Sequence, residues 1–64
     1  MSMISVSSAA IAAIGYSGGT LFVQFHSSTK IYSHHGVSFD VYAAFMHALS
    51  KGVFYSKNIR GRYR

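Results

Sequence analysis

The sequence has no cysteine and no proline, and Asp40 is its single acidic residue among 64. Without cysteine the chain forms no disulfide, no four-cysteine zinc site and no thiol-based catalytic site. General acid–base catalysis by paired carboxylates needs two acidic side chains, and Asp40 is better explained as a charge in the first turn of a helix. We therefore expect no catalytic residues, no cofactor and no enzymatic activity.

Long hydrophobic runs are missing as well. The longest stretch without a polar side chain covers residues 9–16, far short of the roughly 18 residues that a membrane span needs. The first fifteen residues contain no Lys or Arg, so they lack the charged start of a secretion signal. These features predict a cytoplasmic protein that does not associate with a membrane.

The chain does contain enough apolar material for one domain over residues 1–64. Half of its residues are hydrophobic, and they include five Tyr and five Phe. A domain of this length buries only about 60% of its unfolded surface. A homodimer would relieve this limit, so a second copy of the chain is among the partners we consider.

In the N-terminal half, residues 3–6 alternate apolar and polar side chains, and residues 21–26 place Leu21, Val23 and Phe25 on one face, as β-strands do. The apolar run 9–16 is read as part of a first strand, with a helical turn before it as the alternative. A turn centred on Ser28 and Thr29 would place Phe25 opposite Tyr32 and Val23 opposite His34. The pattern predicts an antiparallel three-stranded β-meander with strands at residues 3–16, 20–27 and 30–36.

The C-terminal half has helical spacing, with Ser38 as N-cap and Gly52 as the residue that follows the helix. We predict a helix over residues 39–51 whose apolar stripe is Val41, Phe45, Ala48 and Leu49. A short C-terminal helix capped by Ser56 would then place Arg60 and Arg64 on one face. The fold class is therefore α+β, and we expect a core that includes Phe25, Tyr32, Phe45 and Phe54.

The charge is distributed unevenly. Lys30 and Asp40 cancel within residues 1–50, so the whole net charge of +5 lies in a basic C-terminal tail, residues 51–64. Such a tail favours an anionic partner. The four histidines do not form a metal site in this reading, because His34 and His35 are adjacent on a strand and point to opposite faces. We predict no metal ligands.

Several short motifs follow one another along the chain. A Val-Ser-Ser precedes spaced isoleucines and a Gly-Tyr pair; an apolar strand and a Tyr-x-His come next; the chain closes with Ser-x-Gly, two aromatics, Ile-Arg and a Tyr. These are Val6-Ser7-Ser8, Ile11, Ile14, Gly15-Tyr16, Leu21-Phe22-Val23-Gln24-Phe25, Tyr32-Ser33-His34, Ser50, Gly52, Phe54-Tyr55, Ile59-Arg60 and Tyr63. The ordered set resembles the KTSC domain.

That family comprises small domains found at the C-terminus of some lysyl-tRNA synthetases and as stand-alone proteins of bacteria and phages. The resemblance implies no established catalytic activity, and it makes RNA a suggested ligand. Two departures stand out: the family's Tyr-x-Tyr ends here in His34, and its Val-Pro reads Val37-Ser38. If the Tyr-x-Tyr stacks on bases, His34 is a weaker platform than Tyr.

We therefore expect a non-enzymatic binding module for nucleic acid, above all RNA. Single strands are bound by aromatic rings beside a track of basic side chains. The candidate site residues are Tyr32, His34, Lys51, Tyr55, Lys57, Arg60, Arg62, Tyr63 and Arg64. The alternative is a protein-interaction module, for example a phage-encoded modulator of a host or bacterial protein.

Overall fold

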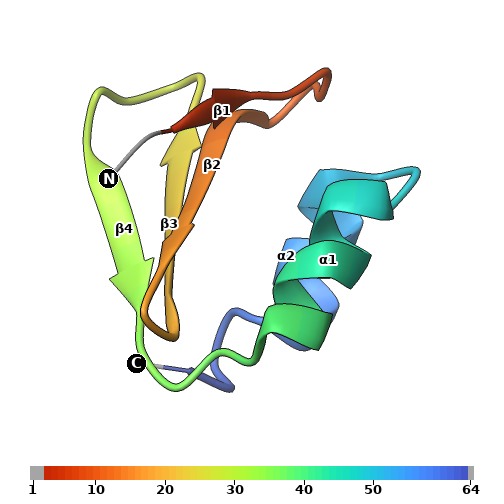
Figure 1. The fold of residues 1–64 in the computed structure, drawn as a ribbon. Coiled ribbons are helices and arrows are strands. Elements are labelled where there is room, and N and C mark those ends of the chain that lie inside the picture. The colour runs from red at the N-terminus through yellow and green to blue at the C-terminus, as the bar shows by residue number, and fades with distance from the viewer. Residues whose placement is uncertain (1–2, 64) are drawn as a thin grey trace.

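The protein is a two-layer α+β domain in which two helices cover one face of a four-stranded sheet (Figure 1). The computed structural model describes residues 3–63. All neighbouring strands are antiparallel, in the order β1-β2-β3-β4. The elements are β1 (Ile4–Ser5), β2 (Ile11–Ser17), β3 (Thr20–Phe25), β4 (Ile31–His34), α1 (Phe39–His47) and α2 (Lys51–Asn58). The predicted fold class is confirmed, with one more strand and a different division of the helices.

The predicted first strand is wrong, because the chain reverses inside it. β1 turns back through residues 6–10 to pair with β2, with Ile4 opposite Ile14. The Ser8 hydroxyl oxygen accepts hydrogen bonds from the backbone N–H groups of Ala10 and Ile11, at 3.3 and 3.2 Å. Serine side chains compete with the strand ladder in this way, and the bonds hold the turn that separates β1 from β2.

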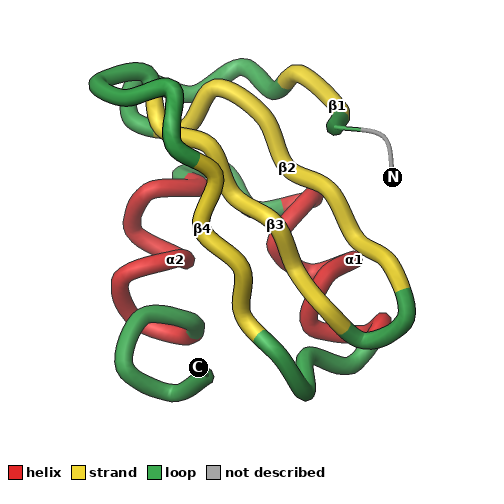
Figure 2. The backbone as a smooth tube through the Cα atoms, turned by 90° about the vertical axis from the view of Figure 1, so that its left-hand side faces the viewer, coloured by secondary structure: helices red, strands yellow, loops and turns green. Residues whose placement is uncertain are grey.

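The pairing of β3 with β4 differs from the predicted register by two residues. Val23 lies opposite Tyr32, and Leu21 lies opposite His34. Side chains alternate between the faces of a sheet, so a shift of two residues changes the partners and leaves each side chain on its predicted face. Tyr32 and His34 therefore share the face of the buried Leu21 and Val23, which is the face that the helices cover (Figure 2).

The predicted helix over residues 39–51 is two helices. α1 begins at the predicted N-cap, where the Ser38 hydroxyl accepts from the N–H of Val41 at 3.4 Å, and it ends at His47. Ala48 is extended, and Ser50 then caps α2 by accepting from the N–H of Val53 at 3.4 Å. A favourable N-cap at Ser50 competes with continuation of α1.

Two detailed predictions fail because of this break. Gly52 lies in the first turn of α2 rather than after a helix, and Ser56 lies inside α2 rather than before a new one. Residues 59–62 form turns, with the N–H of Arg62 bonded to the carbonyl of Ile59 at 3.0 Å. The predicted alignment of Arg60 with Arg64 involves a residue outside the described ones.

The core lies between the sheet and the helices. Phe45 of α1 is fully buried and stacks on Phe54 of α2 with ring centroids 5.4 Å apart. Phe25 and Phe54 pack on this core as predicted, whereas Tyr32 is 39% exposed and Leu49 is fully exposed. The fully buried side chains are Ile11, Ile14, Leu21, Val23, Val37, Phe45 and Ile59.

Gly52 offers a direct test of the two-helix arrangement. A methyl group there would meet the Ala10 Cβ at 3.4 Å, an ordinary contact, and Ala is favoured over Gly inside a helix by about 1 kcal/mol. Gly52→Ala should therefore raise the melting temperature by a few degrees, about 4–8 °C for a gain of 1 kcal/mol. Gly52→Val adds bulk against Ala10 and should lower it. A fall in melting temperature for Gly52→Ala would contradict the helical placement.

Candidate nucleic-acid interface

A hollow of about 310 Å³ opens between the sheet and the C-terminal end of α2. The end of β3 supplies Phe25, β4 supplies Tyr32, and α2 supplies Tyr55 and Ser56. Arg60, in the turn that follows α2, completes the lining. Three of the five lining residues are thus aromatic, and the other two, Ser56 and Arg60, are polar.

The aromatic rings of this hollow pack edge to face. The Phe25 ring centroid lies 5.6 Å from that of Tyr32 and 5.2 Å from that of Tyr55, with interplanar angles of 73° and 82°. The Lys30 ammonium lies 5.2 Å from the centroid of the Tyr32 ring. In the charge pattern Lys30 counts only as the residue that cancels Asp40, but its position two residues before Tyr32 indicates that the two side chains share a face.

His34 connects the sheet to α2 and to the C-terminal turn. Its Nδ1 lies 3.3 Å from the carbonyl oxygen of Tyr63, and its Nε2 lies 2.8 Å from the hydroxyl of Tyr55. A carbonyl oxygen only accepts, so Nδ1 carries the hydrogen, and in the neutral ring Nε2 accepts from the Tyr55 hydroxyl. His34 and Tyr63 thus support the wall of the hollow, and the Tyr63 side chain packs on the core.

Burial raises the pKa of the Tyr55 phenol; the Arg60 guanidinium opposes this rise and Tyr32 adds to it. In the unfolded chain Tyr55 loses its proton near pH 10, its ordinary pKa being about 10. The folded chain retains that proton to higher pH, so it binds more protons than the unfolded chain in this range. Rising pH therefore favours unfolding there.

We accordingly predict that the free energy of unfolding falls as the pH rises above about 10, and that Tyr55→Phe makes this alkaline loss shallower. Denaturant unfolding at a series of pH values measures both slopes. Tyr42→Phe is the matched control, because it removes a different phenol and leaves Tyr55 in place. Equal alkaline loss in the parent and Tyr55→Phe would contradict the prediction.

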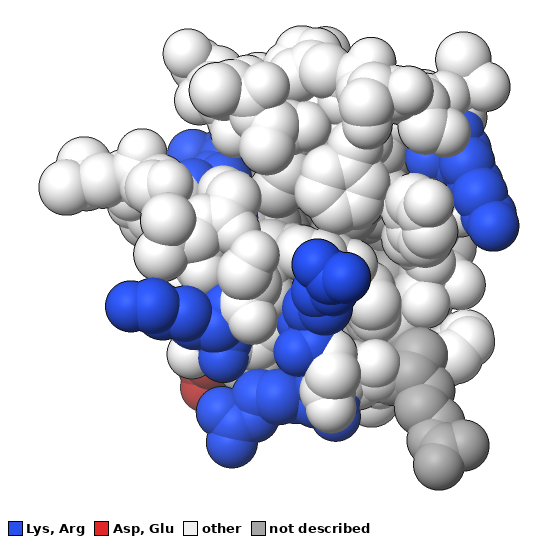
Figure 3. Space-filling model, turned by 180° about the vertical axis from the view of Figure 1, so that it is seen from behind, with Lys and Arg blue, Asp and Glu red and all other residues white. Residues whose placement is uncertain are grey.

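Several basic residues follow the lining residues of this hollow in the sequence, at the C-terminal end of α2. Lys57 is on the last turn of α2, and Arg60 and Arg62 are in the turns that follow; all three are exposed. Figure 3 shows blue side chains gathered on the lower part of this face, with others set apart near its top. Arg64 lies outside the described residues.

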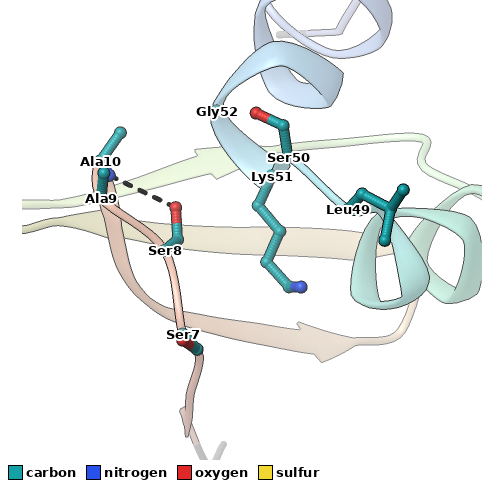
Figure 4. A pocket seen from close by; sticks show the side chains of 8 residues that line it. All are labelled: Ser7, Ser8, Ala9, Ala10, Leu49, Ser50, Lys51 and Gly52. Atoms are coloured by element: carbon teal, nitrogen blue, oxygen red, sulfur yellow. Dashed lines mark hydrogen bonds between the residues drawn. The ribbon is translucent and has the colours of Figure 1, made fainter.

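Lys51 belongs to a different part of the molecule. It starts α2, and about 1.5 Å of rise per residue puts it roughly 12 Å from the other end of that helix. It lines a second hollow, of about 450 Å³, between the β1–β2 turn and the junction of the helices. The lining residues are Ser7, Ser8, Ala9, Ala10, Leu49, Ser50, Lys51 and Gly52 (Figure 4).

Polar groups of this second hollow are engaged within the protein. The Lys51 ammonium donates to the carbonyl oxygen of Ala48 at 3.2 Å. The Ser8 and Ser50 hydroxyls accept backbone hydrogen bonds in the turn and at the helix start. We therefore interpret the second hollow as the space left where the β1–β2 turn meets the start of α2, rather than as a ligand site.

The structure therefore divides the predicted site residues. It brings Tyr32, Tyr55 and Arg60 together around one hollow. His34 and Tyr63 do not line that hollow, and His34 links them to it through its hydrogen bonds to Tyr55 and to the Tyr63 carbonyl. Tyr55 is only 8% exposed, so its ring is a wall rather than an open stacking surface. Sequence reasoning missed Phe25, Ser56 and Lys30 as site residues.

Two further features bear on ligand classes. Among residues 3–63, no group of three or more His, Cys, Asp or Glu side chains is arranged to hold a metal ion. Neither α1 nor α2, the helices of this part of the chain, has the length and apolar character needed to cross a bilayer.

The four-stranded sheet with two helices on one face defines a small α+β domain of known type. The model of the KTSC domain matches residues 7–63, and the chain belongs to that family. The crystal structure of a KTSC domain protein from Yersinia pestis superposes with a TM-score of 0.91 at 34% sequence identity, covering 98% of this chain and 90% of the other. No curated protein matches the chain.

Proposed function

We propose that this protein is a non-enzymatic, cytoplasmic module that binds RNA through its basic C-terminal segment. The observation that carries the proposal is the position of Arg60, which lines the aromatic hollow with Tyr32 and follows α2 into a turn with Arg62. Basic side chains bind backbone phosphates, and an exposed aromatic ring binds bases. Both kinds of contact are available within one short stretch of surface.

The salt dependence of RNA binding tests this proposal. If about three to five basic groups contact phosphates, the logarithm of the affinity for a single strand should fall with the logarithm of salt concentration with a slope of roughly −2 to −3.5. Fluorescence anisotropy of a labelled single-stranded RNA, titrated at several salt concentrations, gives the slope. An anisotropy titration that does not saturate, or a slope near zero, would contradict RNA binding.

The second candidate is a protein-interaction module, which the exposed apolar side chains at the helix junction favour. Leu49 is fully exposed and Val53, four residues later, is 51% exposed. Exposed apolar groups of this kind suit a protein partner or a second copy of the chain. Sedimentation of the parent and of Leu49→Asp tests whether that partner is a second copy of the chain. If the parent is a homodimer, Leu49→Asp should sediment as a monomer; if the parent is a monomer, the two should sediment alike.

A further inference from the structure

We infer that the hollow between β4 and α2 holds one unpaired nucleobase of an RNA strand, with an adjoining phosphate on Arg60. This inference rests on the proposed RNA binding and adds to it a defined base site and a preference for single strands. It assigns the stacking contact to Tyr32 and leaves Tyr55 as a supporting wall.

The size and lining of the hollow suit a single flat ring. At about 310 Å³ it lies at the small end of the range for ligand sites, about 300–1,000 Å³. Aromatic side chains line it on the sheet side and on the α2 side, and Tyr32, at 39%, is the exposed ring among them. An exposed aromatic ring stacks on any base, because every base has a π-face.

Positive charge flanks the Tyr32 ring from two directions. Arg60 lines the hollow from the turn after α2, and the Lys30 ammonium lies over the ring from the turn before β4. Lys30 is exposed and its side chain is long, so its contact with the ring is weak and can be exchanged for a phosphate. No acidic residue lines the hollow, and its charge therefore complements the backbone of a nucleotide.

The wall that supports this site is fixed before any ligand arrives. The Tyr55 hydroxyl is bonded to His34, and the Phe25 ring packs edge to face against both Tyr32 and Tyr55. A site held in this way loses little conformational freedom on binding. In an A-form duplex the bases are stacked and paired, so only an unpaired base can enter.

The test compares one short RNA as a single strand and annealed to its complement, with the full chain and its variants. Tyr32→Ala should weaken single-strand binding by about five- to 150-fold with little change in the salt slope, and it should leave duplex binding unchanged. Tyr32→Phe retains the ring and should bind as the parent does. Phe39→Ala removes another exposed aromatic, on α1, and should also bind as the parent does.

The outcomes separate this inference from the proposed function. If Tyr32→Ala binds the single strand as tightly as the parent while the salt slope persists, the base site is wrong and RNA binding stands. If Phe39→Ala weakens binding as much as Tyr32→Ala does, the stacking assignment to Tyr32 is also wrong. If the parent binds neither form of RNA, both the base site and the proposed function are wrong.

Discussion

Phe45→Ala should lower the free energy of unfolding by about 3–5 kcal/mol, the usual cost of truncating a buried Phe. Phe45 is fully buried, and it joins the two helices by stacking on Phe54 at 5.4 Å. The free energy of unfolding is about 0.05–0.15 kcal/mol per residue in typical domains. The loss is therefore comparable with the whole stability of a chain this short, and the variant should be largely unfolded. Thermal and urea unfolding followed by circular dichroism measure the loss.

Leu49→Ala is the matched control for Phe45→Ala, since both remove a large apolar side chain near the helix junction. Leu49 is fully exposed, and its truncation should change the free energy of unfolding by no more than about 0.5 kcal/mol. A large loss for Leu49→Ala, or an unchanged transition for Phe45→Ala, would mean that the packing of α1 and α2 described above is wrong.

Replacing Arg60, Arg62 and Arg64 together with Gln should flatten the salt slope of single-strand RNA binding by about 2, at about 0.7 per phosphate contact. This electrostatic contribution vanishes at about 1 M salt, where the variant and the parent should bind equally well. At 0.1 M salt, one decade lower, a slope change of about 2 makes the variant bind about a hundredfold more weakly than the parent. The loss should be the same for RNAs of different sequence, because phosphates carry no sequence information.

Single substitutions supply the control for position. Arg60→Gln and Lys51→Gln each remove one positive charge, but Arg60 lines the hollow whereas Lys51 lies at the other end of α2 and donates to the Ala48 carbonyl. Only Arg60→Gln should flatten the slope. If the triple variant binds RNA like the parent at low and high salt, the RNA proposal fails and a protein partner becomes the better explanation.

The sequence predicted the fold class and the faces of the strands well, because both depend on simple periodicity. Leu21 and Val23 are two residues apart on one strand and share a face, so their common burial follows from the period of two even though the predicted β3–β4 register was wrong by two residues. The breaks were harder to predict. Ser8 and Ser50 each cap a local turn or helix, and whether a serine interrupts an element depends on how the tertiary contacts compete with it.

The candidate site was predictable only in part, for a related reason. The run of basic residues after Lys51 indicated an anionic partner, and Tyr32 was identified as a stacking residue. The strand pattern places Tyr32 and Phe25 on one face, but the position of Arg60 beside them depends on α2 packing beside β4, which no local pattern encodes. Burial of Tyr55 and its bond to His34 depend on the same packing.

The RNA contact surface can be mapped residue by residue on the folded chain. Titration of the isotope-labelled protein with a single-stranded RNA, followed in amide NMR spectra, reports which residues sense the ligand. We expect shifts in residues 30–34 and 55–63, and none in residues 7–10 beside the second hollow. Unchanged spectra, or shifts confined to residues 7–10 and 49–52, would contradict it.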